Sequence, residues 1–350
     1  MSRTDASRRR ARLGPVLLVA ASVGACGGGG SRAPLNRGTS SGGGGEVMFE
    51  DERTAREAPP ASEDVERGES LLAAGDAAAA EQAFRAAIEA DPEDPRAHLD
   101  LGLALEMQER FDEAAAAYRA ALEIDATFAE ALNNLGVLLR DSGQHEDAVR
   151  TLREAVRARP GFASAHLNLA LALEDAGDVE GAMRSYERVI ELAPQEPTAR
   201  IQLGLLQLAT GARDDARITL RRAVPHARGS RAHLSALGNG LRRAGDAEMA
   251  LRVLRQSIEA DEVAPPAAIV AELALAQFAA GHREDAEQTL EGLLESHDDY
   301  ATAHYLLANM LAAREAFDEA ASHYQAYLRA APDGPMADQA RARLEHVRSR

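Results

Sequence analysis

The sequence has neither tryptophan nor lysine, only one cysteine, Cys26, and few aromatic residues of any kind (4%). This alanine- and leucine-rich composition argues against β-rich folds, which draw on aromatic and β-branched residues. With a single thiol, the chain cannot form an internal disulfide. All 39 basic residues are arginines and the formal net charge is −17. Because a surface that binds nucleic acid must neutralise phosphates, this acidic balance argues against nucleic acid as a main partner.

The first 25 residues have the pattern of a secretory signal peptide. Five arginines lie among the first twelve residues, and a short apolar run, residues 13–23, follows them. This run is too short to span a membrane. The sequence Val23-Gly24-Ala25-Cys26 resembles the lipobox of bacterial lipoproteins. That resemblance implies removal of residues 1–25, acylation of Cys26 and attachment to a membrane. Gly27 stands where a retention aspartate would hold such a protein at the inner membrane, which favours the outer membrane, facing the periplasm.

Two other interpretations of this terminus remain open. Cys26 could be an incidental small residue of a soluble secreted protein, and Ser7-Arg8-Arg9 could belong to a twin-arginine signal. Residues 26–60, rich in glycine, serine and proline, predict a disordered tether between the acylated cysteine and the rest of the chain. Its glycine runs lack the Lys-Ser/Thr that a phosphate-binding loop requires.

From residue 61 onward the sequence repeats every 34 residues. In the copy at 129–162, Leu132, Leu135, Gly136 and Leu139 share one helical face, and a second helical pattern follows after Gly143. The second pattern includes an alanine that never varies among the eight copies: Ala80, Ala114, Ala148, Ala182, Ala216, Ala250, Ala286 and Ala320. Small residues permit two helices to approach closely. We therefore expect two antiparallel helices in each copy, with Gly136 opposite Ala148 at the crossing.

The period and pattern resemble the tetratricopeptide repeat. This resemblance implies an all-α fold, a right-handed superhelical solenoid of eight antiparallel helix pairs, with residues 335–350 as a C-terminal capping helix. The predicted repeats are 61–94, 95–128, 129–162, 163–196, 197–230, 231–264, 267–300 and 301–334. Glu109 and Glu315 replace the turn glycine in the second and eighth copies, while Gln207 and Gln277 replace a core leucine in the fifth and seventh. We expect these four copies to be held less tightly.

No residue pattern in the chain predicts catalysis or a cofactor. The ten histidines form neither an HExxH motif nor a paired Cys/His arrangement, so no metal site is expected. His98, His166 and His304 recur at the same place in the repeat, about one repeat apart, which is too far to share an ion and favours a packing role. Neither a nucleophile elbow nor a Ser-His-Asp arrangement is evident. The chain is expected not to be an enzyme and to need no small-molecule substrate.

The inner wall of the solenoid, formed by the first helix of each pair, is the candidate binding surface for proteins or peptides. The sixth residue of the repeat, in the second to fifth copies, is Asp100, Asn134, Asn168 and Gln202. This series resembles the asparagine ladder in the repeats of O-linked N-acetylglucosamine transferases. That resemblance implies amides that pair with the backbone of an extended peptide. Solvated polar residues are the alternative. The ninth residue of the same copies is apolar: Leu103, Val137, Leu171 and Leu205. These side chains could line the groove as an apolar seam, or they could pack between adjacent copies.

Together these features predict a lipid-anchored scaffold of the cell envelope that binds protein partners. Tetratricopeptide lipoproteins that assist pilus or secretin assembly, or that hold cell-wall enzymes, resemble it. Two alternatives stay open. The chain could be an accessory subunit that recruits substrate for an envelope glycosyltransferase or wall hydrolase, or a spacer that contacts its neighbours through the convex face.

Overall fold

The computed structural model describes residues 62–260 and 263–350. These residues form seventeen α-helices and one short 3₁₀ helix, and no strand occurs among them. The all-α prediction is therefore confirmed. The helices are α1 (Glu63–Ala73), α2 (Ala77–Ala90), α3 (Pro95–Met107), α4 (Phe111–Ile124), α5 (Ala129–Asp141), α6 (His145–Ala158), α7 (Ala163–Asp175), α8 (Val179–Leu192), α9 (Thr198–Ala209), α10 (Arg213–Ala223), η1 (Val224–His226), α11 (Arg231–Arg243), α12 (Ala247–Glu259), α13 (Ala267–Ala279), α14 (Arg283–Ser296), α15 (Ala301–Ala313), α16 (Phe317–Ala330) and α17 (Ala337–Arg348).

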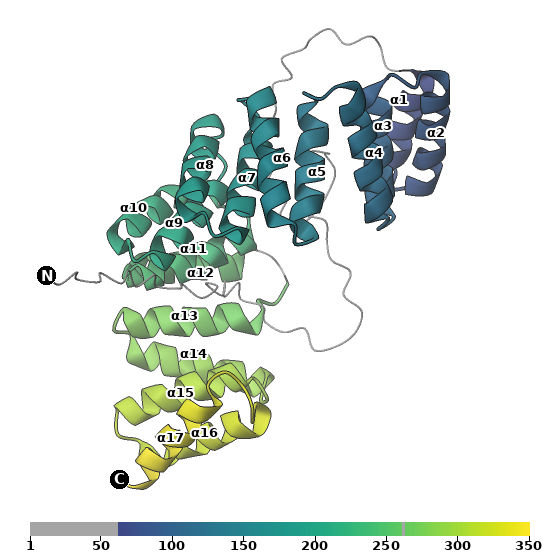
Figure 1. The fold of residues 1–350 in the computed structure, drawn as a ribbon. Coiled ribbons are helices and arrows are strands. Elements are labelled where there is room, and N and C mark those ends of the chain that lie inside the picture. The colour runs from purple at the N-terminus through teal and green to yellow at the C-terminus, as the bar shows by residue number, and fades with distance from the viewer. Residues whose placement is uncertain (1–61, 261–262) are drawn as a thin grey trace, which may run out of the picture.

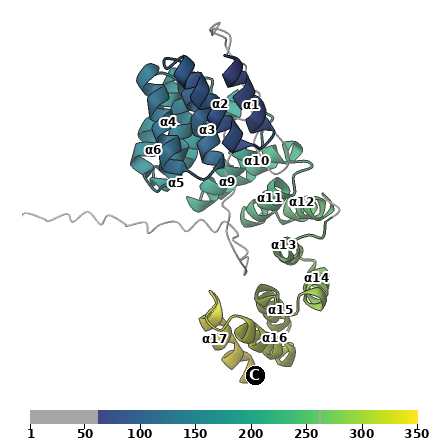
Figure 2. The same ribbon diagram turned by 90° about the vertical axis from the view of Figure 1, so that its right-hand side faces the viewer.

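Successive helix pairs stack along a curved path, with α1 and α2 at one end and α15 to α17 at the other (Figure 1). The view turned by 90° shows the same order, with the C-terminal helices far from α1 (Figure 2). The last helix, α17, packs against α16 through Ala337, Ala340 and Val347, and so covers the apolar end of the array. None of the helices in the described ranges combines the length and the hydrophobicity that a membrane span requires.

The turn between the two helices of a pair ends the first helix in the same way throughout the array. In the third repeat, Gly143 has φ +78°, its N–H donates to Arg140 O (2.9 Å), and the N–H of Gln144 donates to Leu139 O (2.8 Å). This is a Schellman motif, which needs a left-handed residue and therefore favours glycine. Glu109 and Glu315 adopt φ +60° and +67° at the equivalent places. Since a left-handed conformation strains a residue with a Cβ atom, these two glutamates weaken their turns.

At the crossing of the two helices, a large side chain of the second helix lies against a small residue of the first. A Cβ atom built on Gly136 would lie 2.5 Å from Leu152 Cγ, so Gly136 lies directly against Leu152. The same small-against-large contact recurs at Gly68 with Phe84 and at Gly102 with Tyr118. The large partners are fully buried in all eight repeats: Phe84, Tyr118, Leu152, Tyr186, Leu220, Leu254, Leu290 and Tyr324. A small residue on the first helix thus makes room for a large one on the second.

The invariant alanine lies beside this contact, and its side chain is completely buried in every repeat. Apolar side chains of neighbouring repeats then join into larger clusters, one of which runs from Leu99 to Leu203 across the second to fifth repeats. No helix pair could bury this surface alone, so stacking of the repeats stabilises each of them.

Candidate functional site

The first helices of the pairs lie on the inner side of the curve. They contact one another directly along much of the array, as α1 does with α3, α5 with α7, α9 with α11 and α11 with α13. The second helices of successive pairs make no comparable contact within the described residues. Elements on the inside of a bend approach one another more closely, so the first helices form the concave surface. The candidate binding residues all belong to these helices.

Three asparagines on α5 and α7 form a buried chain of hydrogen bonds. Asn168 Nδ2 donates to Asn133 Oδ1 (2.9 Å), and Asn133 Nδ2 donates to Asn134 Oδ1 (3.2 Å). Asn133 is 2% exposed, whereas Asn134 and Asn168 are each 7% exposed. The predicted pair Asn134 and Asn168 is therefore brought together through Asn133, which the sequence reasoning missed. Its only sequence signal is an amide at a position that is apolar in most other repeats.

Asp100 and Gln202, the other two predicted polar positions, are half-buried on α3 and α9. The hydrogen-bonded amides belong to the third and fourth repeats.

The predicted apolar positions lie against the core. Leu103 and Leu171 are half-buried and pack on the central apolar cluster, and Leu205 packs on the cluster of the fifth and sixth repeats. Val137 is 1% exposed. These contacts favour packing between adjacent repeats, because little of Val137 is left for a ligand to touch.

Charged residues follow the amides at the C-terminal ends of α5 and α7. Arg140, whose side chain is 7% exposed, pairs with Asp141 (2.9 Å) and approaches Asp175 of the next repeat (3.8 Å). Burial raises the pKa of Glu174, although a hydrogen bond from the Tyr186 hydroxyl opposes this shift. Burial, and then the nearby Glu174, raise the pKa of Tyr186. The contact between Arg140 and Asp175 connects adjacent repeats, whereas Glu174 and Tyr186 join the two helices of the fourth repeat.

The recurring histidines bind backbone carbonyl groups. His98, His166 and His304 each place Nε2 near the carbonyl oxygen six residues earlier, at Pro92 (3.3 Å), Pro160 (3.2 Å) and Asp298 (2.9 Å). This contact fixes the turn that leads into the first helix, which is a structural role. Within residues 62–260 and 263–350, no group of three or more His, Cys, Asp or Glu side chains is arranged to hold a metal ion.

His304 has a second contact, with His323 of α16, and their Nδ1 atoms are 2.9 Å apart. Only one of the two nitrogens can carry the proton that joins them. Burial, followed by the charge of His304, lowers the pKa of His323. This pair therefore favours the neutral form of His323 in the folded chain.

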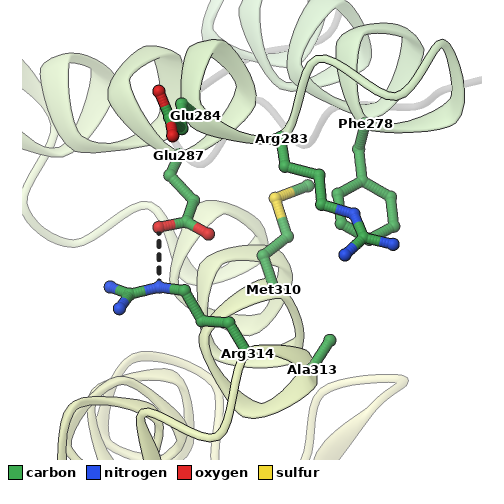
Figure 3. Close-up of a pocket in the computed structure, with 7 residues that line it drawn as sticks. All are labelled: Phe278, Arg283, Glu284, Glu287, Met310, Ala313 and Arg314. Carbon is green, nitrogen blue, oxygen red and sulfur yellow. Dashed lines mark hydrogen bonds and ion pairs between the residues drawn. The ribbon is translucent and has the colours of Figure 1, made fainter.

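Two pockets lie between adjacent repeats, each near the turn that joins the two helices of a pair. Both have a volume of about 330 Å³. One, between the seventh and eighth repeats, is lined by apolar residues that include Phe278 and Met310 and by four charged residues (Figure 3). The other, between the fifth and sixth repeats, is lined by Leu208 and three arginines, Arg213, Arg242 and Arg243. The sequence reasoning identified neither pocket.

Models of protein families match most of the repeat region. One described as tetratricopeptide repeat matches residues 65–127, 133–197 and 271–335, and two others of the same description match 173–239 and 231–256. The chain belongs to the tetratricopeptide repeat family. The comparison with curated proteins finds no match.

Solved structures share this tetratricopeptide repeat fold. PilF of Pseudomonas aeruginosa is 24% identical, with a TM-score of 0.50, and the match covers 56% of this chain and 89% of PilF. A tetratricopeptide repeat protein from Parabacteroides merdae is 17% identical, also with a TM-score of 0.50, over 71% of this chain and 98% of that one. These identities support the fold only. Cys26, the signal peptide predicted at 1–25 and the tether at 26–60 lie outside the described residues.

Proposed function

We propose that the chain is a lipid-anchored, non-enzymatic scaffold of the cell envelope, which holds protein partners on the concave side of its repeats. It would be attached to the outer membrane and face the periplasm, where it would assist the assembly of a pilus, secretin or cell-wall complex. The observation that carries the binding role is the amide chain of Asn133, Asn134 and Asn168 on the concave surface. Anchoring is supported by the position of Cys26 in a lipobox and by its being the only cysteine.

The two ends of the amide chain have capacity for a ligand. Asn133 uses both its amide nitrogen and its oxygen within the chain. In the described part of the molecule, these hydrogen bonds leave Asn134 Nδ2 as a donor and Asn168 Oδ1 as an acceptor. One donor and one acceptor complement the C=O and N–H groups of an extended peptide, whatever its side chains. At 7% exposure, little of either residue reaches the surface, so a ligand would contact only a small part of it.

Crosslinking and affinity capture with the whole chain test the binding role. The variant Asn134→Ala/Asn168→Ala removes both ends of the amide chain, and we expect it to lose the partners that the natural chain captures. Asn239→Ala is the matched control, since Asn239 is a half-buried asparagine on α11 outside the amide chain. Far-ultraviolet circular dichroism establishes that both variants are folded. Retention of every partner by the folded double variant would contradict peptide capture at this site.

Anchoring is tested separately by metabolic labelling with a palmitate analogue in a bacterial host. We expect label on the natural chain in the membrane fraction, and neither label nor membrane attachment in Cys26→Ser. Separation of inner and outer membranes on a density gradient then tests the location. An unlabelled natural chain in the soluble fraction would contradict the lipid anchor while leaving the binding role intact.

A further inference from the structure

One segment of the acidic chain has the opposite charge. Residues 197–245, which comprise α9, α10, η1 and α11, contain nine arginines and two aspartates, a formal charge of +7. The whole chain has −17. We call residues 197–245 the basic segment. Salt screens interactions between surface charges beyond about 10 Å, so a charged ligand near α9 to α11 responds mainly to the charge of this segment and less to that of the whole chain.

The pocket between the fifth and sixth repeats lies within the basic segment, and we call it the arginine pocket. Leu208 comes from the end of α9, Arg213 from the start of α10, and Arg242 and Arg243 from the end of α11. Arg213 Nη2 donates to the backbone oxygen of Arg243 (3.2 Å), so its guanidinium reaches from one repeat to the next. This hydrogen bond holds Arg213 beside Arg243 without neutralising either charge.

Only one of the three guanidinium groups has an acidic partner. Arg242 Nε lies 3.1 Å from Glu272 Oε2 on α13. Arg213 and Arg243 form no ion pair with any residue in the described ranges, and both are exposed. The pocket therefore keeps two positive charges that the protein itself does not balance.

The pocket between the seventh and eighth repeats provides the comparison. Phe278 and Arg283 occupy the repeat positions of Leu208 and Arg213. Two glutamates line that pocket as well, and one of them, Glu287, pairs with Arg314 (3.0 Å; Figure 3). The basic segment has an arginine, Arg217, at the repeat position of Glu287. Charges are thus mixed in one pocket and uniformly positive in the other.

We infer that the arginine pocket binds carboxylate groups of an acidic segment in a protein partner. Guanidinium groups recognise carboxylates through paired, charge-assisted hydrogen bonds. Leu208 gives the pocket an apolar surface for the aliphatic part of an acidic side chain. Of the other arginines of α10, Arg217 pairs with Asp214 (2.8 Å) and Arg221 with Asp246, so Arg222 is the one that adds to the positive charge of this helix. The acidic remainder of the chain repels the same segment and so directs it to this site.

This site is separate from the amide chain on α5 and α7, although it rests on the proposed role in binding proteins. The test is a titration of the whole chain with a fluorescein-labelled synthetic peptide that alternates glutamate and leucine, followed by anisotropy. We expect Arg213→Gln/Arg243→Gln to weaken binding by about tenfold or more, because the two guanidinium groups supply the charge-assisted hydrogen bonds to the carboxylates. Raising the salt concentration should weaken binding to the natural chain and bring it closer to the variant.

Arg283→Gln, the same change at the equivalent position of the mixed-charge pocket, is the matched control and should bind as the natural chain does. Arg213→Lys/Arg243→Lys keeps the charge and should retain more binding than the glutamine variant. Equal binding by the natural chain and the glutamine variant would overturn the inference. So would saturable binding of inorganic phosphate by the natural chain without binding of the peptide. The loss of affinity caused by Arg213→Gln/Arg243→Gln should be the same in the natural chain and in an Asn134→Ala/Asn168→Ala background, so failure here and failure of the amide site are distinguishable.

Discussion

Replacing Gly136 by alanine tests whether the crossing of α5 and α6 sets the spacing of the array. The new Cβ atom would lie 2.5 Å from Leu152 Cγ and 2.9 Å from Leu152 Cδ2. Carbon atoms pack comfortably at about 3.5–4.0 Å, so the overlap is about 1 Å. Leu152 is completely buried and has no open space to enter. Either its side chain leaves a favourable rotamer or the two helices move apart.

Two opposing effects determine the size of the change. Overpacking of a well-packed core destabilises by about 1–3 kcal/mol. Alanine in a helix interior is favoured over glycine by about 1 kcal/mol. We therefore expect Gly136→Ala to lower the free energy of unfolding by up to about 2 kcal/mol. Gly292 in α14 is the matched control, because a Cβ atom there meets nothing within 4 Å. Gly292→Ala should raise the free energy of unfolding by up to about 1 kcal/mol.

Urea denaturation of the whole chain, followed by circular dichroism, measures both effects. The m-value must be compared along with the midpoint, since a repeat array can unfold in parts. Leu152→Ala alone should cost about 2–5 kcal/mol. In the double variant, the methyl group introduced by Gly136→Ala would occupy part of the resulting cavity, so the combined loss should be smaller than the sum of the two. Additive losses, or a Gly136→Ala variant as stable as Gly292→Ala, would refute the proposed contact.

Three further predictions concern the turns, the core and the histidine pair, each measured by denaturation of the whole chain. Glu109→Gly should raise the free energy of unfolding by about 1 kcal/mol, because glycine adopts φ +60° without strain; a loss of stability would contradict strain at this turn. Gln277→Leu should raise it by about 1–2 kcal/mol, because the buried amide oxygen has no hydrogen-bond partner among the described residues; an unchanged midpoint would show that the oxygen is satisfied. The pKa of His323 is lowered in the folded chain, so its contribution to stability is present above about pH 6.5 and is lost as the pH falls through the folded pKa. His323→Gln should reduce the fall in the free energy of unfolding as the pH decreases, whereas the exposed control His346→Gln should not. If the free energy of unfolding of His323→Gln depended on pH as that of the natural chain does, the histidine pair would be excluded as a cause.

The sequence sufficed to predict the helix pairs, because small residues, turn glycines and apolar positions all recur with one period. It did not predict that Leu152 lies directly against Gly136. A side chain on a helix leans toward the N-terminus of that helix, so Leu152 extends over the turn that begins at Ala148. The sequence shows that both positions are apolar, but the direction of the leucine side chain decides which of them fills the crossing.

The candidate site was harder to predict, because it depends on contacts between repeats. Asn133 joins Asn134 to Asn168 only because α5 and α7 lie close together on the concave side, and the repeat pattern alone does not give that distance. The arginine pocket had a sequence signal in the charge of residues 197–245, which averaging over the whole chain conceals. Local charge, counted repeat by repeat, would have indicated it.

The two candidate sites differ in what they can recognise. A buried amide must be hydrogen-bonded to avoid a loss of stability, so the amides of the third and fourth repeats are mostly satisfied by one another, and only their ends remain for a peptide backbone. Such contacts are independent of the sequence of the ligand. Arg213 and Arg243 are exposed and keep their full charge, so they distinguish an acidic ligand from a neutral one and also accelerate its association. Since both sites belong to one stacked array, a partner that reached both would obtain general affinity from the amides and selectivity from the arginines.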